Sequence, residues 1–288
     1  MNKTPTSARA ETTLCFVGGG NMAFAIIQGL IRAGMPAIDI QVIEPQASQQ
    51  DKLRALDSNL HVFASQADAS LSVDAVILAV KPQIMREVCA TLAGALPTSS
   101  APAFISIAAG IRTTAIQTWL DRDVAVIRAM PNQGALIGQG STGLFANEYS
   151  ANTDKAIAER TMAAVGSAIW VDEEQGIDSV TAISGSGPAY FFLLMELMQR
   201  TGESFGLPAT DVRQLVTETA LAAAALAAQD GADSEALRRT VTSPGGTTAA
   251  AVEHMLDNGI DALLTNALKK ARERAGELAD NAERAPNT

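Results

Sequence analysis

Short apolar runs alternate with segments of helical periodicity over the first half of the chain. The apolar runs lie at residues 14–17, 39–43, 61–64, 73–80, 103–107 and 124–128. The run at 73–80 (VDAVILAV) is apolar at nearly every position, which is typical of a strand buried on both faces of a parallel sheet. Strands that alternate with helices in this way predict a doubly wound α/β sheet.

The pattern becomes helical after about residue 166. Residues 189–198 (AYFFLLMELM) are apolar on almost every side, which predicts a helix that is buried all round. Gly206-Leu207-Pro208 ends this helix, and a second helix is expected at 209–228. Its last turns (LAAAALAA) are too small to close a core alone. We therefore expect a second copy of the chain to complete it.

A glycine-rich turn stands between the first apolar run and the first helical segment. In FVGGGNMA, Gly18 makes a tight turn, Gly20 lets the backbone approach a pyrophosphate, and Ala23 replaces the third glycine of the dinucleotide fingerprint. The diphosphate would then lie at the N-terminus of the following helix. A strand-to-helix turn without a ligand has the same glycines, but the strand and helix that the fingerprint requires are both expected here.

These elements predict an N-terminal Rossmann-type domain followed by an all-α domain. We place a loose tail at residues 1–12, the dinucleotide-binding domain at 13–170, and a helical substrate and dimerisation domain at 171–288. The chain of 288 residues is long enough for roughly two such domains.

Two charged residues follow predicted strands. Glu44 lies 24 residues after Gly20, where an acidic residue can bind a ribose 2′-hydroxyl and favour NAD over NADP. A solvated turn glutamate beside Pro45 is the alternative. Lys81 precedes Pro82 at a strand end, on the edge of the sheet where ligands bind, and could meet a phosphate or a ribose.

Two loops in the second half combine serine, glycine and proline at helix starts. In 243–248 (SPGGTT), Ser243 is expected to cap the helix, and two glycines would weaken it by about 1 kcal/mol each unless the backbone must approach a ligand closely. Residues 184–188 (SGSGP) have the same composition. Each could be a tight turn between helices. Together, beside a dinucleotide domain, they favour a carboxylate site.

Composition excludes several other functions. A net charge of −10 without a basic patch argues against nucleic acid and anionic membranes. Cys15 and Cys89 have no metal-ligand spacing, so we expect reduced thiols, no metal and a cytoplasmic protein. Residues 1–11 lack an apolar core and read as neither a signal peptide nor an anchor. The Ala/Leu run at 220–228 is too short to cross a bilayer.

The chain resembles the pyrroline-5-carboxylate reductases from about residue 14 to the end of the helix that follows SPGGTT. The motifs are FVGGGNMA, AVKPQ (79–83), SIAAG (106–110), IRAMPN (127–132), AISGSGPAY (182–190) and SPGGTT, in order. The resemblance implies reduction of L-1-pyrroline-5-carboxylate to L-proline by NADPH or NADH, the last step of proline synthesis. It also implies a homodimer or a larger assembly of dimers.

The resemblance also implies site residues. The cofactor would be held by Gly18, Gly19, Gly20, Asn21, Met22, Gln66, Ala79, Val80, Lys81, Pro82, Ala109 and Gly110. Glu44 joins this cofactor set because of its spacing from Gly20. The substrate carboxylate and ring would be held by Ser184, Ser243, Gly245, Gly246, Thr247 and Thr248, with the catalytic contacts assigned to Thr248 and Ser243. Gln133-Gly134 departs from the usual Thr-Pro, and Glu44 departs from the small polar residues usual with NADPH, so the preferred cofactor stays open.

Two other functions fit the pattern less well. A β-hydroxy-acid dehydrogenase would place a catalytic lysine on the helical domain, and this chain has no lysine from Val180 to Leu264. A nucleotide sensor without turnover would not need the second, substrate-like loop. Hydride transfer to a cyclic imine needs orientation more than a strong acid, so the two histidines, His61 and His254, are expected to have no catalytic role.

Overall fold

The computed structural model describes residues 12–97 and 101–284. The chain forms two compact units: Met1–Gly185 with Ala271–Thr288, and Ser186–Lys270. The predicted tail lies outside the described residues except for Thr12.

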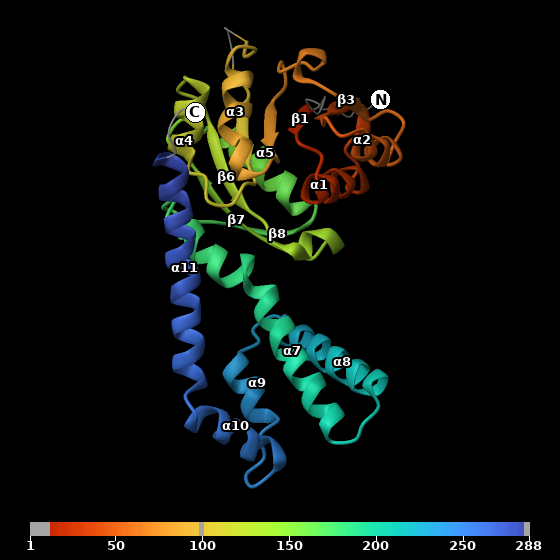
Figure 1. Ribbon diagram of the computed structural model, residues 1–288, viewed down its shortest axis with the longest axis vertical. Helices are drawn as coiled ribbons and strands as arrows, with labels where there is room; N and C mark the ends of the chain where they lie inside the picture. The colour runs from red at the N-terminus through yellow and green to blue at the C-terminus, as the bar shows by residue number, and fades with distance from the viewer. Residues whose placement is uncertain (1–11, 98–100, 285–288) are drawn as a thin grey trace, which may run out of the picture. The chain divides into compact units, whose positions relative to one another are not determined.

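The first unit contains a β-sheet with helices packed around it (Figure 1). Its strand order is β3-β2-β1-β4-β5-β6-β7-β8. All neighbouring strands are parallel except β6 and β7, and the order of the first six is that of a Rossmann sheet. The predicted doubly wound sheet is therefore confirmed, whereas β7 and β8 were not predicted. The strands are β1 (Leu14–Val17), β2 (Ile40–Ile43), β3 (His61–Phe63), β4 (Ala75–Leu78), β5 (Ala103–Ser106), β6 (Val126–Met130), β7 (Gly140–Ala146) and β8 (Gly166–Trp170).

Helices cover both faces of this sheet because alternate strand residues point to opposite sides. Leu14 and Phe16 pack with side chains of α1 (Asn21–Arg32), α2 (Ala47–Arg54) and α5 (Asn152–Ala163). Cys15 and Val17 pack with side chains of α3 (Pro82–Ala93) and α4 (Thr113–Leu120). The result is a three-layer domain whose central strands are completely buried.

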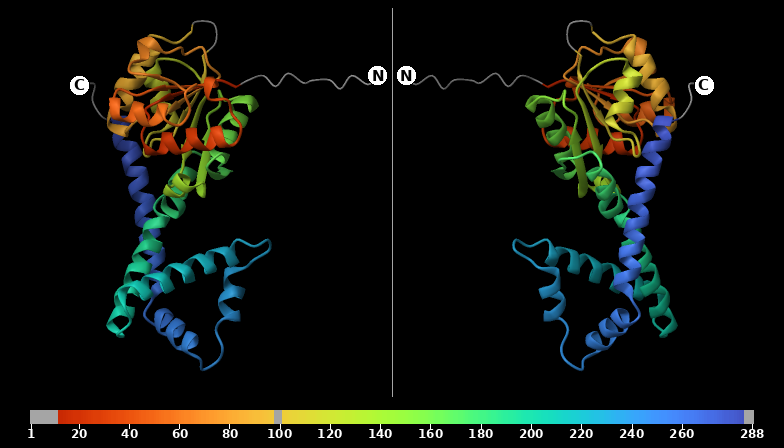
Figure 2. Two further views of the ribbon diagram at one scale, coloured as in Figure 1. Left: turned by 90° about the vertical axis from the view of Figure 1, so that its right-hand side faces the viewer. Right: turned by 90° about the vertical axis from the view of Figure 1, so that its left-hand side faces the viewer.

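The second unit is made of helices. It contains α7 (Gly187–Ser204), α8 (Ala209–Ala227), α9 (Ser234–Thr240), α10 (Thr247–Asp257) and the first part of α11 (Ile260–Arg284), whose last part belongs to the first unit. Helices α7 and α8 pack against each other and are joined by the predicted break at 206–208 (Figure 2).

Helix α7 differs from its prediction. It was expected to be buried all round, but in the single chain Phe191, Leu193 and Leu197 are 65%, 55% and 46% exposed. The continuous helical segment 176–204 is long and apolar enough to cross a membrane by length and composition alone. In the single chain α8 packs against one side of α7, and the prediction of burial all round is therefore wrong for the chain alone. The apolar sequence of α7 would be buried if another surface covered its exposed side.

Candidate functional site

The predicted cofactor residues follow the carboxyl ends of neighbouring strands. Strand β1 lies between β2 and β4, and Val17 is in register with Ile43 on one side and Leu78 on the other. From β1 the strand order runs to β2 and β3 on one side and to β4, β5 and β6 on the other, so the order reverses between β1 and β4. In open α/β sheets this switch point is where ligands bind.

The glycine turn has the geometry of a phosphate cradle. Gly18 has φ +96°, and a Cβ there would lie 2.7 Å from the Ala79 carbonyl oxygen, so only glycine fits beside the end of β4. A Cβ on Gly20 would meet no atom of the described residues within 4 Å. Within the described part of the chain, no side chain caps the N-terminus of α1 and its first turn holds no acidic residue. Its N–H groups are therefore suited to a diphosphate.

Glu44 joins β2 to the glycine turn. Its Oε2 accepts a hydrogen bond of 2.8 Å from the Gly19 N–H, and its Oε1 accepts one of 2.8 Å from the Gln46 N–H. The residue is only 7% exposed, so it is not the solvated turn glutamate of the alternative interpretation. Gln49 holds the same turn from its other side, donating from Nε2 to the Gly19 carbonyl oxygen. An ionised carboxylate accepts about four hydrogen bonds, which leaves capacity for a ribose hydroxyl.

The segment after β4 lies next to the glycine turn. The Ala79 N–H donates to the Val17 carbonyl oxygen over 2.8 Å, and Val80 Cγ1 lies 3.1 Å from the place of a Cβ on Gly18. Lys81 is exposed at the N-cap of α3, and Pro82 occupies its first turn. Gln66 is more distant in the chain and lies in a short 3₁₀ turn, where its Nε2 is 3.5 Å from the Thr91 carbonyl oxygen.

The turn after β5 is partly covered by the end of α11. A Cβ on Gly110, whose φ is +70°, would lie 3.1 Å from Leu278 Cβ, and Arg112 donates a hydrogen bond of 2.6 Å to Asp280. Ala109 is exposed while Gly110 is buried. Gly110 is therefore glycine because a helix packs closely against it, and Ala109 is the accessible residue of the pair.

The SPGGTT loop lies in the second unit and begins α10. The prediction that Ser243 caps this helix is wrong: the N-cap is Gly246, and the Gly246 N–H donates to the Ser243 carbonyl oxygen over 3.0 Å. Gly245 has φ +70°, so the chain makes a separate turn before the helix starts. Within the described residues no side chain caps α10. The N–H groups of Thr247 and Thr248 therefore start the helix without a side-chain partner.

Ser184 lies in a π-helical turn, Thr181–Gly185, between α6 (Gly176–Val180) and α7. Its carbonyl oxygen accepts a hydrogen bond of 3.1 Å from Asn132 Nδ2. Asn132 directly follows Pro131 at the end of β6 and caps the 3₁₀ turn Gln133–Ile137. The sequence motif AMPN contained this asparagine, but no role was predicted for it.

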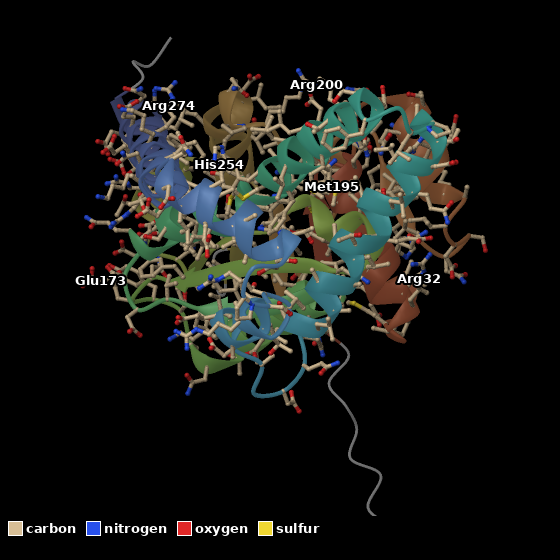
Figure 3. The ribbon with its side chains drawn as sticks, turned by 90° about the horizontal axis from the view of Figure 1, so that it is seen from below. Arg32, Glu173, Met195, Arg200, His254 and Arg274 are labelled. Carbon is tan, nitrogen blue, oxygen red and sulfur yellow. The ribbon has the colours of Figure 1, made fainter. Side chains whose placement is uncertain are left out.

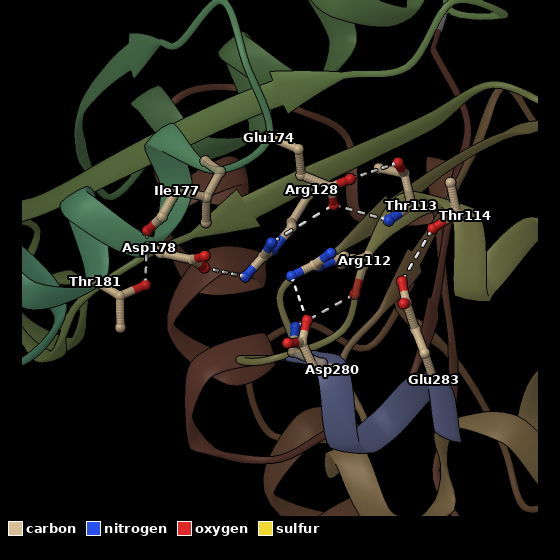
Figure 4. A network of polar contacts seen from close by, with 12 residues as sticks. Arg112, Thr113, Thr114, Arg128, Glu174, Ile177, Asp178, Thr181, Asp280 and Glu283 are labelled. Carbon is tan, nitrogen blue, oxygen red and sulfur yellow. Dashed lines mark hydrogen bonds and ion pairs between the residues drawn. The ribbon is translucent and has the colours of Figure 1, made fainter. Parts of the chain in front are cut away.

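Arg128 is a buried charge that the sequence analysis missed (Figure 4). It lies in β6, its side chain is 2% exposed, and it pairs with Asp178 at 3.2 Å and Glu174 at 3.5 Å. Glu174 also accepts hydrogen bonds from the N–H and the hydroxyl of Thr113, at the start of α4. These charges line a cavity of about 240 Å³, in which the arginines are already paired with carboxylates. The network holds α4 and α6 to the sheet.

Both thiols are buried, and both histidines have local partners. Burial raises the pKa of both Cys15 and Cys89 to about 12, so each is a neutral thiol at neutral pH. His254 lies on α10 (Figure 3). Its carbonyl oxygen accepts a hydrogen bond of 2.7 Å from Asn258 Nδ2. His61 stacks on Phe63. Over residues 12–97 and 101–284, no group of three His, Cys, Asp or Glu side chains is arranged to hold a metal ion.

Comparison with known proteins identifies two family models in the chain. The model described as pyrroline-5-carboxylate reductase dimerisation matches residues 174–278, and the one described as NADP oxidoreductase, coenzyme F420-dependent, matches residues 13–110. A pyrroline-5-carboxylate reductase of Pseudomonas aeruginosa is 44% identical over 93% of this chain and 97% of its own length. One of Arabidopsis thaliana is 33% identical over 92% and 95%.

Solved structures agree with the sequence comparison. A pyrroline-5-carboxylate reductase from Coxiella burnetii has a TM-score of 0.88 and 38% identity, with 93% of this chain and 99% of that one covered. The Plasmodium falciparum enzyme, whose structure contains NADP, has a TM-score of 0.80 and 25% identity over 93% and 98%. The identities, their coverage of whole relatives and the dimerisation model lead to one conclusion: the chain belongs to the pyrroline-5-carboxylate reductase family.

Proposed function

We propose that this protein reduces L-1-pyrroline-5-carboxylate to L-proline, with NADPH or NADH as the hydride donor, in the last step of proline synthesis. The observation that carries the proposal is the match to the Pseudomonas aeruginosa reductase over 97% of that enzyme's length. The uncapped start of α1 beside an open Gly20 supports it, because the same residues suit a dinucleotide.

The dinucleotide lies along the carboxyl edge of the sheet. Its diphosphate binds at the start of α1, where the backbone N–H groups of Asn21 and Met22 are available, and Lys81 supplies a positive charge near it. Glu44 binds the ribose of the adenosine. The remaining contacts come from Gly18, Gly19, Gly20, Gln66, Ala79, Val80, Pro82, Ala109 and Gly110, of which Gly110 acts through the shape of its turn.

The substrate carboxylate binds at the start of α10. Gly245 and Gly246 give it access to the backbone, and no acidic residue of the described chain lies in the first turn to repel it. The hydroxyl of Thr248 contacts the ring near the imine nitrogen. Ser243 and Thr247 belong to the same loop, and Ser184 is the further substrate-binding residue that the sequence predicts.

The chemistry requires orientation more than acid or base catalysis. When bound, the reduced nicotinamide supplies the hydride. The protonated imine is already an electrophile: its carbon receives the hydride, and the electron pair of the C=N bond moves to nitrogen, which becomes the amine of proline. The residues of this chain align the imine carbon with the donor, and such alignment contributes a large part of the rate in reactions of this kind.

The protein acts as a homodimer, or an assembly of dimers, in the cytoplasm. The dimerisation model spans α7 and α8, whose exposed apolar side chains need a cover. A second copy of α7 and α8 provides it, in place of a lipid bilayer or a nucleic acid, and the net charge of −10 is consistent with that. We also propose that the dinucleotide-binding domain ends at residue 170 and that the helical substrate and dimerisation domain begins at residue 171.

A direct test is an assay of purified protein with pyrroline-5-carboxylate and each reduced cofactor, following nicotinamide absorbance and proline formation together. We expect both signals to change in equal amounts. Thr248→Ala should lower kcat/KM by about 2- to 12-fold, the effect of one neutral hydrogen bond, without weakening nucleotide binding. Nucleotide binding without any substrate-dependent oxidation would contradict the proposal and favour a sensor.

A further inference from the structure

Asn132 connects two loops that belong to distant parts of the chain. Its Oδ1 accepts hydrogen bonds of 3.1 Å from the N–H groups of both Gly134 and Ser141. Its Nδ2 donates one of 3.1 Å to the carbonyl oxygen of Ser184. The two acceptor bonds determine which way the amide is turned, because only oxygen can accept from an N–H group. Nδ2 is thereby directed at Ser184.

The Ser184 carbonyl needs a partner from outside its helix. In a regular helix it would accept from the N–H of the residue four positions later, which here is Pro188. Proline has no N–H group. The π-helical turn Thr181–Gly185 displaces the backbone further from the regular pattern, and such turns are frequent at functional sites. The amide of Asn132 supplies the missing donor.

The contact is reinforced by close packing on both loops. A Cβ on Gly185 would lie 2.9 Å from Met130 Cε, so the turn rests against the last residue of β6. A Cβ on Gly134 would lie 2.3 Å from the Gln139 carbonyl oxygen, and the Gln139 N–H donates to the Gly134 carbonyl oxygen. The loop that carries Asn132 is therefore tightly closed, and the turn that carries Ser184 packs against the end of β6 beside it.

We propose that Asn132 is a positioning residue of the reductase, which fixes Ser184 and Gly185 at the carboxyl end of β6. This inference rests on the proposed function, in which Ser184 belongs to the substrate site. The asparagine acts through the Ser184 backbone, since its side-chain hydrogen bonds go to the backbone groups of Gly134, Ser141 and Ser184. It therefore affects the alignment of the substrate and leaves dinucleotide binding to the glycine turn.

Asn132→Asp isolates this role, because the carboxylate keeps an acceptor for Gly134 and Ser141 but loses the donor to Ser184. Asn147→Asp is a matched control: Asn147 is a buried asparagine that accepts from the Val126 N–H and donates to the Val124 carbonyl oxygen, at the opposite end of β6. Both changes introduce the same charge and remove the same kind of hydrogen bond.

We expect Asn132→Asp to raise KM for pyrroline-5-carboxylate or lower kcat so that kcat/KM falls about tenfold, with the Kd for NADPH within about twofold of wild type. Asn147→Asp should lower Tm by about as much as Asn132→Asp does, while its kcat/KM stays within about twofold of wild type. Equal kinetics in the two variants would overturn the positioning role. A wild-type protein without reductase activity would instead contradict the proposed function.

A second variant covers the case in which Asn132→Asp does not fold. In Asn132→Ala with Pro188→Ala, position 188 regains the backbone N–H that a regular helix would direct at the Ser184 carbonyl oxygen. We expect this double variant to fold and to regain part of the kcat/KM that Asn132→Ala alone loses. A double variant that is unfolded, or no more active than Asn132→Ala, would show that the asparagine has a purely structural role.

Discussion

Replacing Glu44 should change the choice between NADPH and NADH. The carboxylate accepts from the N–H groups of Gly19 and Gln46, each at 2.8 Å, and its remaining lone pairs are available to a ribose hydroxyl. A 2′-phosphate at that place would meet a like charge. Glu44→Gln and Glu44→Ser should therefore favour NADPH by about 1–3 kcal/mol, or about 5- to 150-fold in the ratio of the two kcat/KM values.

The same substitution has a second effect that must be separated from the first. Glu44→Ser leaves the buried Gly19 N–H without its acceptor, which costs about 1–3 kcal/mol and should weaken both cofactors equally. Gln49→Ala is the control, because Gln49 holds the Gly19 carbonyl oxygen and leaves the charge at Glu44 unchanged. It should lower both kcat/KM values without changing their ratio.

The assay is the initial rate of nicotinamide oxidation at several concentrations of each cofactor with saturating substrate. Glu44→Gln is the more selective variant, since it retains one oxygen for the turn. If the NADPH to NADH ratio were the same in wild type, both Glu44 variants and Gln49→Ala, Glu44 would serve only to hold the glycine turn.

Three further results are expected. Gly246→Val should abolish turnover and weaken inhibition by L-proline, because the new Cβ would lie 3.1 Å from the Ser243 carbonyl oxygen and crowd the loop. The affinity for NADPH, measured by fluorescence titration, should stay normal. A parallel loss of NADPH binding would contradict this expectation. Arg128→Ala should reduce the free energy of unfolding, measured by denaturant titration, by about 3–5 kcal/mol, because two carboxylates lose a buried partner. Replacing the exposed Arg200 by alanine should change this free energy by less than about 1 kcal/mol. Similar losses in the two variants would refute the stabilising role of the buried network. Burial raises the pKa of Cys15 and Cys89 from 9.0 to about 12, so the contribution of these thiols to the free energy of unfolding is complete below pH 9 and is lost as pH rises toward 12. The native protein should also resist alkylation at neutral pH, and rapid alkylation would show that the thiols are accessible.

The Rossmann half was predictable because its signals are local. Strand β1 is an apolar run that stops at three glycines, and the apolar run that contains β4 stops at Lys81-Pro82, two residues after the strand itself ends at Leu78. The local sequence therefore indicated both strands and the edge they share. Strand β7 was missed because its sequence, GSTGLFA, contains two glycines and two hydroxyl residues. Its pairing with β6 is a long-range effect that no short window of sequence contains.

The candidate site was predictable only in part. Glycines at turns are visible in a sequence, which is why the turns at Gly18 and Gly245 could be predicted. Arg128 and Asn132 were missed because their partners lie about fifty residues further along the chain, at Asp178 and Ser184. The incorrect capping role of Ser243 has a related cause: Gly245 takes a positive φ and turns the chain before the helix begins, and the sequence does not specify that turn uniquely.

Transfer of deuterium from the cofactor to proline tests the central claim most directly. The protein would be incubated with pyrroline-5-carboxylate and NADPH or NADH that carries deuterium on both positions of the reactive nicotinamide carbon, and the proline analysed by mass spectrometry and NMR. We predict a single deuterium in each proline, bound to the ring carbon that was the imine carbon. Proline without deuterium, or cofactor oxidation without proline, would contradict direct hydride transfer to the imine by this protein.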